Sequence, residues 1–155
     1  MNSKNQNHPM EIGWREWVTL PGLKVPAIKA KIDTGARTSA LHTFHIETFS
    51  EQGVEKVRFK LHPLQRNTDL VIECISPVID TRTVKDSGGH AEERIVIETP
   101  LKIGDREWPI EITLTSRDDM MFRMLLGRTA IKDGNLFVSP GKSYINGRSL
   151  RKAYK

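Results

Sequence analysis

The chain has 155 residues, a length that suits one domain with a core of its own. Its hydrophobic fraction of 37% and charged fraction of 28% are typical of globular proteins, and no run approaches the roughly 20 apolar residues of a membrane span. The polar first ten residues lack the apolar centre of a signal peptide, and the single cysteine, Cys74, excludes an internal disulfide. These features exclude a membrane protein or a disulfide-rich secreted protein and predict a cytoplasmic location.

The net charge of +5 is concentrated at the C-terminal end. Residues 142–155 carry five basic residues and no acidic one, and the other 19 basic residues balance the 19 acidic ones. Only 6% of the residues are aromatic, which provides no obvious platform for stacking bases. The charge therefore indicates a basic tail and does not favour a nucleic acid as partner.

In chain order, residues 1–10 are predicted to be a disordered lead-in, 11–147 a single domain and 148–155 a basic tail. Most of the domain is predicted to form short strands separated by glycine-containing turns. Apolar and polar residues alternate with the two-residue period of a half-buried strand at 28–32, 56–61, 94–98 and 110–114.

Two further segments have different patterns. Residues 70–75 form a continuous, mostly apolar run, which predicts a strand buried on both faces with Cys74 as a small core residue. Residues 128–133 are the only predicted helix, and Gly134 and Asn135 end it. The sequence thus predicts an all-β fold with one short helix near its C-terminal end, a small barrel or sandwich.

Two cofactor patterns were considered and neither is complete. Residues 141–143 read Gly-Lys-Ser as at the end of a phosphate-binding loop, but Leu136 stands where that motif needs its first glycine. His42 and His45 could hold zinc together with Cys74 or His90. However, side chains three apart in a strand point to opposite faces, which favours separate histidines. The sequence therefore predicts no metal site and no cofactor.

One constellation has a specific chemical meaning. The strand at 28–32 leads into Asp33-Thr34-Gly35, and the apolar segment 124–126 leads through Gly127-Arg128 into the predicted helix. In this order and spacing the chain resembles the retropepsin-like aspartic peptidases over residues 12–147. Four segments resemble more closely a bacterial family known as ATP-dependent zinc proteases: GWREWVTLP, KIDTGARTSALH, SGGHAEERIVI and EITLTSRDDMMFRMLLGR. That family is associated with an ATP-grasp ligase that adds glutamates to a ribosomal protein.

The resemblance implies a small closed acid-protease barrel with one short C-terminal helix. It implies that Asp33 is the catalytic carboxylate, that Thr34 bonds across two copies of the turn, and that Gly35 admits backbone amides close to Asp33. Residues 86–89 correspond to the flap, a lid over the site. The residues expected to bind substrate are Ala36, Arg37, Gly88, Gly89, Arg94, Leu126, Gly127 and Arg128. Together with Arg117, three of these arginines could line a cleft for an acidic peptide, although each could also be a solvated surface charge.

Aspartic peptidases need two carboxylates about 3 Å apart that share one proton. A single Asp-Thr-Gly supplies one of them, so the resemblance implies a homodimer with the site on its two-fold axis. Retropepsins pair the arginine of their Gly-Arg segment with an acid that follows Asp-Thr-Gly-Ala. Here Arg37 and Thr38 occupy those positions, so Arg128 lacks that partner.

Three hypotheses follow from the sequence. The first is an aspartic peptidase that cleaves a protein or peptide; a glutamate-rich substrate and an ATP-grasp ligase as partner rest on the family association alone. The second is a metal-dependent peptidase with ligands among His42, His45, His90 and Cys74. The third is a non-catalytic peptide-binding module in which Asp33 is an ordinary turn residue between two strands.

Overall fold

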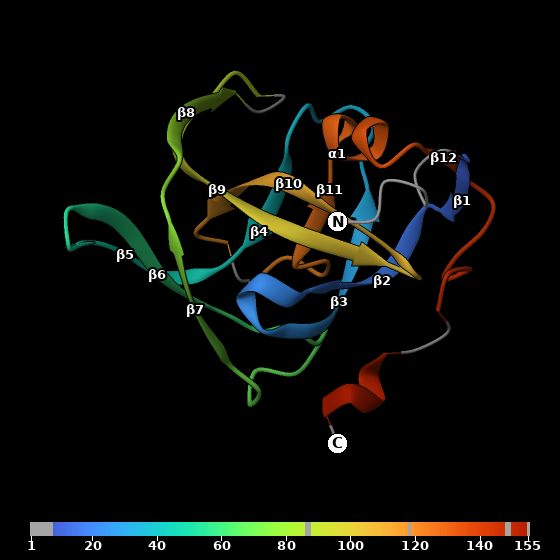
Figure 1. Cartoon of the computed structure of the whole chain (residues 1–155), viewed down its shortest axis with the longest axis horizontal. Coiled ribbons are helices and arrows are strands. Elements are labelled where there is room, and N and C mark those ends of the chain that lie inside the picture. Colours follow the sequence, from blue (N-terminus) through green and yellow to red (C-terminus); the bar gives the residue numbers. More distant parts are fainter. Residues whose placement is uncertain (1–7, 86–87, 118, 148–149, 155) are drawn as a thin grey trace.

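The computed structural model describes residues 8–85, 88–117, 119–147 and 150–154, which are mostly strands (Figure 1). The helical parts are α1 (Arg128–Asp133) and two short 3-10 segments, Pro21–Leu23 and Arg151–Tyr154. The strands are β1 (Met10–Gly13), β2 (Arg15–Leu20), β3 (Val25–Ile32), β4 (Ser39–His42), β5 (Phe44–Glu51), β6 (Val54–Leu61), β7 (Ile72–Pro77), β8 (Asp80–Lys85), β9 (Ala91–Ile103), β10 (Arg106–Thr115), β11 (Met124–Leu126) and β12 (Leu136–Ser139).

The main sheet closes on itself. Its strand order is β10-β4-β11-β3-β2-β9-β8, and β9 also pairs with β10, so that six strands form a ring and β8 extends outward from β9. Pairing of Thr19 with Lys102 joins β2 to β9 and completes the ring. The predicted all-β barrel with one short helix is confirmed, because the α-helix occupies residues 128–133 as expected.

The position of β11 matters most for the site. This strand runs parallel to β3 and antiparallel to β4, with Met124 opposite Ala30 on one side and Leu41 on the other. The parallel register also places Leu126 opposite Ile32, the last residue of β3. The ends of β3 and β11 therefore lie together, although about ninety residues separate them in the sequence.

The alternating patterns place their apolar residues in one core. On β3, Ile28 and Ala30 are fully buried between the outward-facing Lys29 and Lys31, as the alternation predicts. The fully buried large side chains come from most of the strands: Ile12, Leu20, Ile28, Leu41, Phe59, Leu61, Ile97, Leu101, Ile103, Ile112, Met124 and Leu126. This core fixes the barrel and with it the spacing of the loops at its ends.

The apolar run at 70–75 is a correction. We predicted burial on both faces, but β7 buries Cys74 and Ser76 on one face and leaves Ile75 49% exposed on the other. The strand is the edge of a three-stranded sheet of order β5-β6-β7, and Glu73, Ile75 and Pro77 on its outer face are exposed. Cys74 itself is a core residue, as predicted, and burial raises the pKa of its thiol to about 12.

The two ends of the described chain pack on the barrel. β1 pairs in parallel with β12, and the Tyr154 hydroxyl bonds the backbone of Ala27. The boundaries proposed for the lead-in and the tail stay predictions. Within the described segments, no helix has both the length and the apolar character required to cross a membrane.

Candidate active site

Asp33 is the first residue after β3, and its turn is held by its own hydrogen bonds. The backbone N–H of Asp33 donates to the Leu126 carbonyl at 2.9 Å, and its carbonyl accepts from the Ala36 N–H at 3.2 Å. Its carboxylate Oδ1 accepts from the Gly35 N–H at 3.1 Å. A Cβ on residue 35 would lie 3.3 Å from that oxygen, so glycine allows this close approach. Asp33 has intermediate exposure as a residue, and this hydrogen bond orients its carboxylate within the turn.

Residues at the start of α1 form hydrogen bonds with the backbone of the Asp33 turn and of the residues that follow it. The backbone N–H groups of Arg128 and Thr129 donate to the carbonyls of Ala36 and Arg37 at 2.7 and 3.0 Å. The guanidinium of Arg128 donates through Nη1 to the Thr34 carbonyl at 3.0 Å. Arg128 therefore has a backbone acceptor on the Asp33 turn in place of the acidic partner that retropepsins provide.

Gly127 permits this contact between the two segments. A Cβ at this position would lie 2.6 Å from the Thr38 carbonyl carbon and 2.8 Å from the Ser39 nitrogen. The Gly127 N–H donates to Ser39 Oγ at 2.9 Å. Glycine at this position therefore allows the two segments to approach closely.

A cavity of about 880 Å³ lies beside the Asp33 turn. Residues 35–40 and β10 line it together with β8 on one side and α1 on the other, and Figure 1 shows β8 and α1 on either side of β4 and β10. Four residues singled out from the sequence line it: Gly35, Ala36, Arg37 and Arg94. The others do not: Asp33, Thr34, Gly88, Gly89, Leu126, Gly127 and Arg128.

The residues for which a flap was expected lie at the tip of the hairpin of β8 and β9, and their role as a flap stays a prediction. The two strands pair antiparallel as far as Lys85 and Ala91, and residues 82–85 line the cavity. At the tip, Gly88 and Gly89 are exposed and Gly89 has a φ of +84°, a conformation that favours glycine. Asp86 and Ser87 of the expected flap lie outside the described residues.

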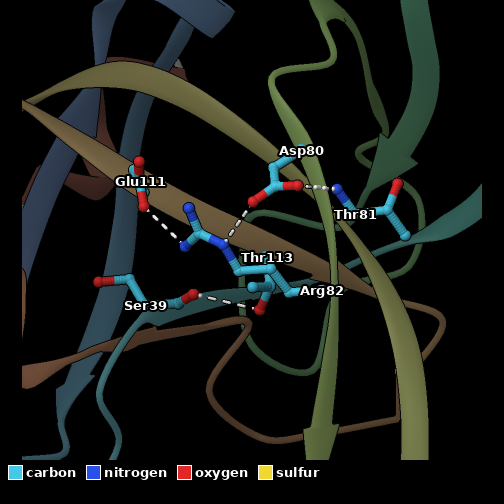
Figure 2. Close-up of polar contacts among 6 residues, drawn as sticks. All are labelled: Ser39, Asp80, Thr81, Arg82, Glu111 and Thr113. Atoms are coloured by element: carbon cyan, nitrogen blue, oxygen red, sulfur yellow. Dashed lines mark hydrogen bonds and ion pairs between the residues drawn. The ribbon is translucent and has the colours of Figure 1, made fainter.

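Arg82 is a cavity residue that the sequence analysis missed (Figure 2). Its Nε lies 2.8 Å from Asp80 Oδ2 and its Nη1 2.7 Å from Glu111 Oε1, so that it ties β8 to β10. The two carboxylates raise the pKa of the guanidinium. Asp80 and Arg82 are two residues apart, so in a strand their side chains lie on one face, and the sequence could have indicated this pair. The pairing with Glu111 could not be predicted in this way, because Glu111 belongs to a distant segment.

The charges around the cavity are mixed. The lining contains three acidic and four basic residues. The acidic ones are Glu98, Glu111 and Asp133, and the basic ones are Arg37, Arg82, Lys85 and Arg94. Arg82 is neutralised by its own pair of carboxylates. Arg117, which was expected to join this cleft, is not among the lining residues; its charge acts on His42 instead.

The candidate zinc ligands do not converge. In the described parts of the chain, no three His, Cys, Asp or Glu side chains lie close enough together to hold a metal ion. His42 Nδ1 lies 2.6 Å from Thr115 Oγ1, His45 is exposed, and Cys74 Sγ lies 3.6 Å from the Leu23 carbonyl oxygen. The donor set present therefore does not fit a zinc site.

Residues 11–149 match a family model described as RimB-like, retropepsin-like aspartic endopeptidase RimB. The chain belongs to this RimB-like family. A crystal structure of a Legionella pneumophila protein of unknown function, Lpg0085, has a similar fold: its TM-score is 0.75 at 27% identity, over 90% of this chain and 99% of that one. The RimB-like assignment agrees with the barrel, the Asp-Thr-Gly turn and the Gly-Arg segment described above.

Two curated relatives have a different name. Proteins from Desulfotalea psychrophila and Shewanella pealeana, both named probable alpha-L-glutamate ligase, are 48% and 45% identical to this chain over 147 and 136 residues. The aligned regions cover 92% and 88% of this chain but 32% and 30% of those proteins. The RimB-like chain thus spans about a third of the length of the curated relatives it matches.

Proposed function

We propose that this RimB-like chain is a peptidase in which Asp33 is the catalytic carboxylate. The observation that carries the proposal is the position of Asp33 at the end of β3, with its carboxylate hydrogen-bonded in its own turn and an 880 Å³ cavity, lined partly by the β8–β9 hairpin, beside it. Leu126 and Arg128 bond the backbone of its turn, as a rigid catalytic loop requires. Family membership supports the same chemistry.

The proposed mechanism needs a second carboxylate. An ionised aspartate activates a water molecule, and a protonated one polarises the scissile carbonyl. In the described chain no hydrogen bond joins Asp33 to another carboxylate. The proposal therefore takes the second carboxylate from Asp33 of a second copy, with the two turns facing each other across a two-fold axis.

The proposed substrate is an acidic, glutamate-rich peptide segment. Arg37, Lys85 and Arg94 line the cavity, and guanidinium groups bind carboxylates through paired hydrogen bonds. The names of the relatives point the same way, since a glutamate ligase makes glutamate-containing products. This chain matches only about a third of those relatives, so the proposal places a ligase activity outside the matched part and takes an ATP-grasp ligase as the partner.

Digestion of a peptide library that includes glutamate-rich peptides, read by mass spectrometry, tests this function. We expect cleavage by the wild type with and without a chelator, and none by Asp33→Asn. Asp69→Asn is the matched control, because Asp69 is an exposed aspartate in a different turn. Cleavage by Asp33→Asn would remove Asp33 from the mechanism, and loss of cleavage with the chelator alone would support a metal-dependent peptidase.

The alternative function is a non-catalytic peptide-binding module. It is favoured by one observation: the Asp33 carboxylate accepts the Gly35 N–H of its own turn, as a purely structural turn residue does. Under this alternative, acidic peptides bind equally to the wild type and to Asp33→Asn, and neither protein cleaves them.

A further inference from the structure

A buried basic cluster lies where β4, β9, β10 and the start of β11 come together. It consists of His42, Arg94 and Arg123, of which His42 is 5% and Arg123 7% exposed. The backbone N–H of His42 donates to the backbone carbonyl of Arg123 at 2.7 Å, and the ring atom His42 Nδ1 lies 2.6 Å from the Thr115 hydroxyl on β10. The three cluster residues thus come from three separate segments, Thr115 on β10 adds a fourth, and the cluster is distinct from the Asp33 turn.

Four nitrogen atoms of this cluster have no hydrogen-bond partner among the described residues. His42 Nε2, Arg94 Nε and both Nε and Nη1 of Arg123 are buried and have no hydrogen-bond partner in the described structure. A charged donor buried without an acceptor is strongly unfavourable, so proteins pair such groups with an anion or an acceptor. The four unpaired donors of this cluster therefore favour binding of an anion that can accept their hydrogen bonds.

Two other arginines of the described chain, one buried and one partly exposed, do have acceptors for their guanidinium groups. The Nη1 and Nη2 atoms of Arg106 donate to the carbonyls of His8, Gly134 and Asn135. Arg82 binds two carboxylates. Arg106 Nε is also buried without a partner, so the cluster of His42, Arg94 and Arg123 differs in bringing four such nitrogens together.

Among the described residues, the acidic groups that act on the cluster are Glu92 and Asp119. Arg94 Nη2 lies 3.5 Å from Glu92, and Asp119 has only a small effect on His42. Burial and the charges of Arg117, Arg94 and Arg123, in that order, lower the pKa of His42 to about 4. The imidazole is therefore neutral at pH 7, and when Thr115 donates to Nδ1 the proton sits on Nε2, a further donor in the same cluster.

We propose that His42, Arg94 and Arg123 form a binding site for a single oxyanion, which accepts hydrogen bonds from their unpaired nitrogens. Carboxylate and sulfate- or phosphate-type anions share the required chemistry, with two or more oxygens for guanidinium donors. Arg94 also lines the 880 Å³ cavity, so an anion carried by a bound peptide and a free anion can both approach. The site does not depend on peptidase activity and is separate from Asp33.

Nuclear magnetic resonance of the His42 ring in the full chain tests the site without any activity assay. At pH 6 the ring is titrated with sulfate, which stays fully ionised, and with the side-chain carboxylate of an N-acetylglutamate amide, against chloride at equal ionic strength. We expect saturable shifts of His42 and, with sulfate bound, an upward shift of its pKa by at least one unit. Saturation by both probes indicates a site for free anions, and saturation by the glutamate compound alone indicates a carboxylate site.

Two variants make the test specific. Arg123→Met is expected to weaken binding at least 10-fold, and Arg94→Gln serves the same purpose if Arg123→Met does not fold. Arg58→Gln is the matched control, since it removes one charge from an arginine that pairs with Glu47 and Glu73 on another sheet, and binding should stay within twofold. The absence of saturable shifts at tens of millimolar anion, or equal weakening by Arg58→Gln, would overturn the proposal.

Discussion

At the residue scale, single atoms decide whether the segments around Asp33 can meet. Gly127 has no room for a methyl group, because backbone atoms of Thr38 and Ser39 would lie only 2.6 to 2.8 Å from its Cβ. The atoms in the way belong to the backbone of the loop that follows Asp33, which cannot move independently of the turn. The same residue thus serves the packing of β11 and the geometry of the site.

Gly127→Ala is predicted to lower the free energy of unfolding by about 3 kcal/mol or more, because the new methyl group overpacks against backbone. Denaturant unfolding measures this change. Gly141→Ala is the control: a Cβ there meets nothing within 4 Å, and its effect should stay within about 0.5 kcal/mol. Equal effects of the two substitutions would contradict the close contact at Gly127.

His42 predicts a pH dependence of stability. Its pKa is lowered from 6.5 to about 4 in the folded chain, so between these values the unfolded state binds the extra proton. The free energy of unfolding is therefore expected to fall as the pH drops from 6.5 to 4, by up to about 3 kcal/mol. In His42→Asn, whose amide can still bond Thr115, this part of the pH dependence should vanish; an unchanged profile would contradict it.

At the element scale, strands act through what they bring together. Glu16 on β2 is fully buried, and its carboxylate accepts the backbone N–H of Gly13 at 2.7 Å and those of Ile145 and Asn146 at 3.2 Å. One side chain thus joins β1, β2 and the segment after β12. These contacts hold the closing strands of the chain against the barrel.

Glu16→Gln is predicted to destabilise the fold by about 1–3 kcal/mol, because an amide replaces one acceptor oxygen by a donor that faces backbone N–H groups. Thermal unfolding measures the loss. Glu107→Gln removes the same charge from an exposed position on β10 and should have little effect. If Glu107→Gln cost as much, the loss would reflect net charge and not the buried contacts.

At the scale of the whole molecule, the barrel presents one Asp33 turn. Under the proposed mechanism, activity requires two copies, so specific activity should fall on dilution below the dissociation constant of the dimer. Sedimentation velocity measured over the same concentrations should show the matching shift from dimer to monomer. Asp33→Asn should dimerise like the wild type, and full activity of a strict monomer would exclude the shared site.

The sequence by itself determined the local structure. The alternation of apolar and polar residues predicted strands β3, β6 and β10, and Gly134 after residues 128–133 predicted the end of the helix. Both signals act over a few neighbouring residues, so they can be recognised in the sequence. The Asp-Thr-Gly and Gly-Arg motifs were also readable, and the resemblance they support placed both in one site. The burial of Cys74 followed from its apolar neighbours.

Only the tertiary structure decided which distant residues meet. Ile75 is exposed because β7 lies at a sheet edge. Arg82 can pair with Glu111 because β8 lies beside β9, next to β10. The cluster around His42 forms because four segments converge there. Strand order and register set these contacts, and a local pattern carries no information about which strand becomes its neighbour. The sequence could therefore single out Asp33 as a candidate, whereas the cavity beside it and the unpaired nitrogens of Arg94 and Arg123 arise only from the closed barrel.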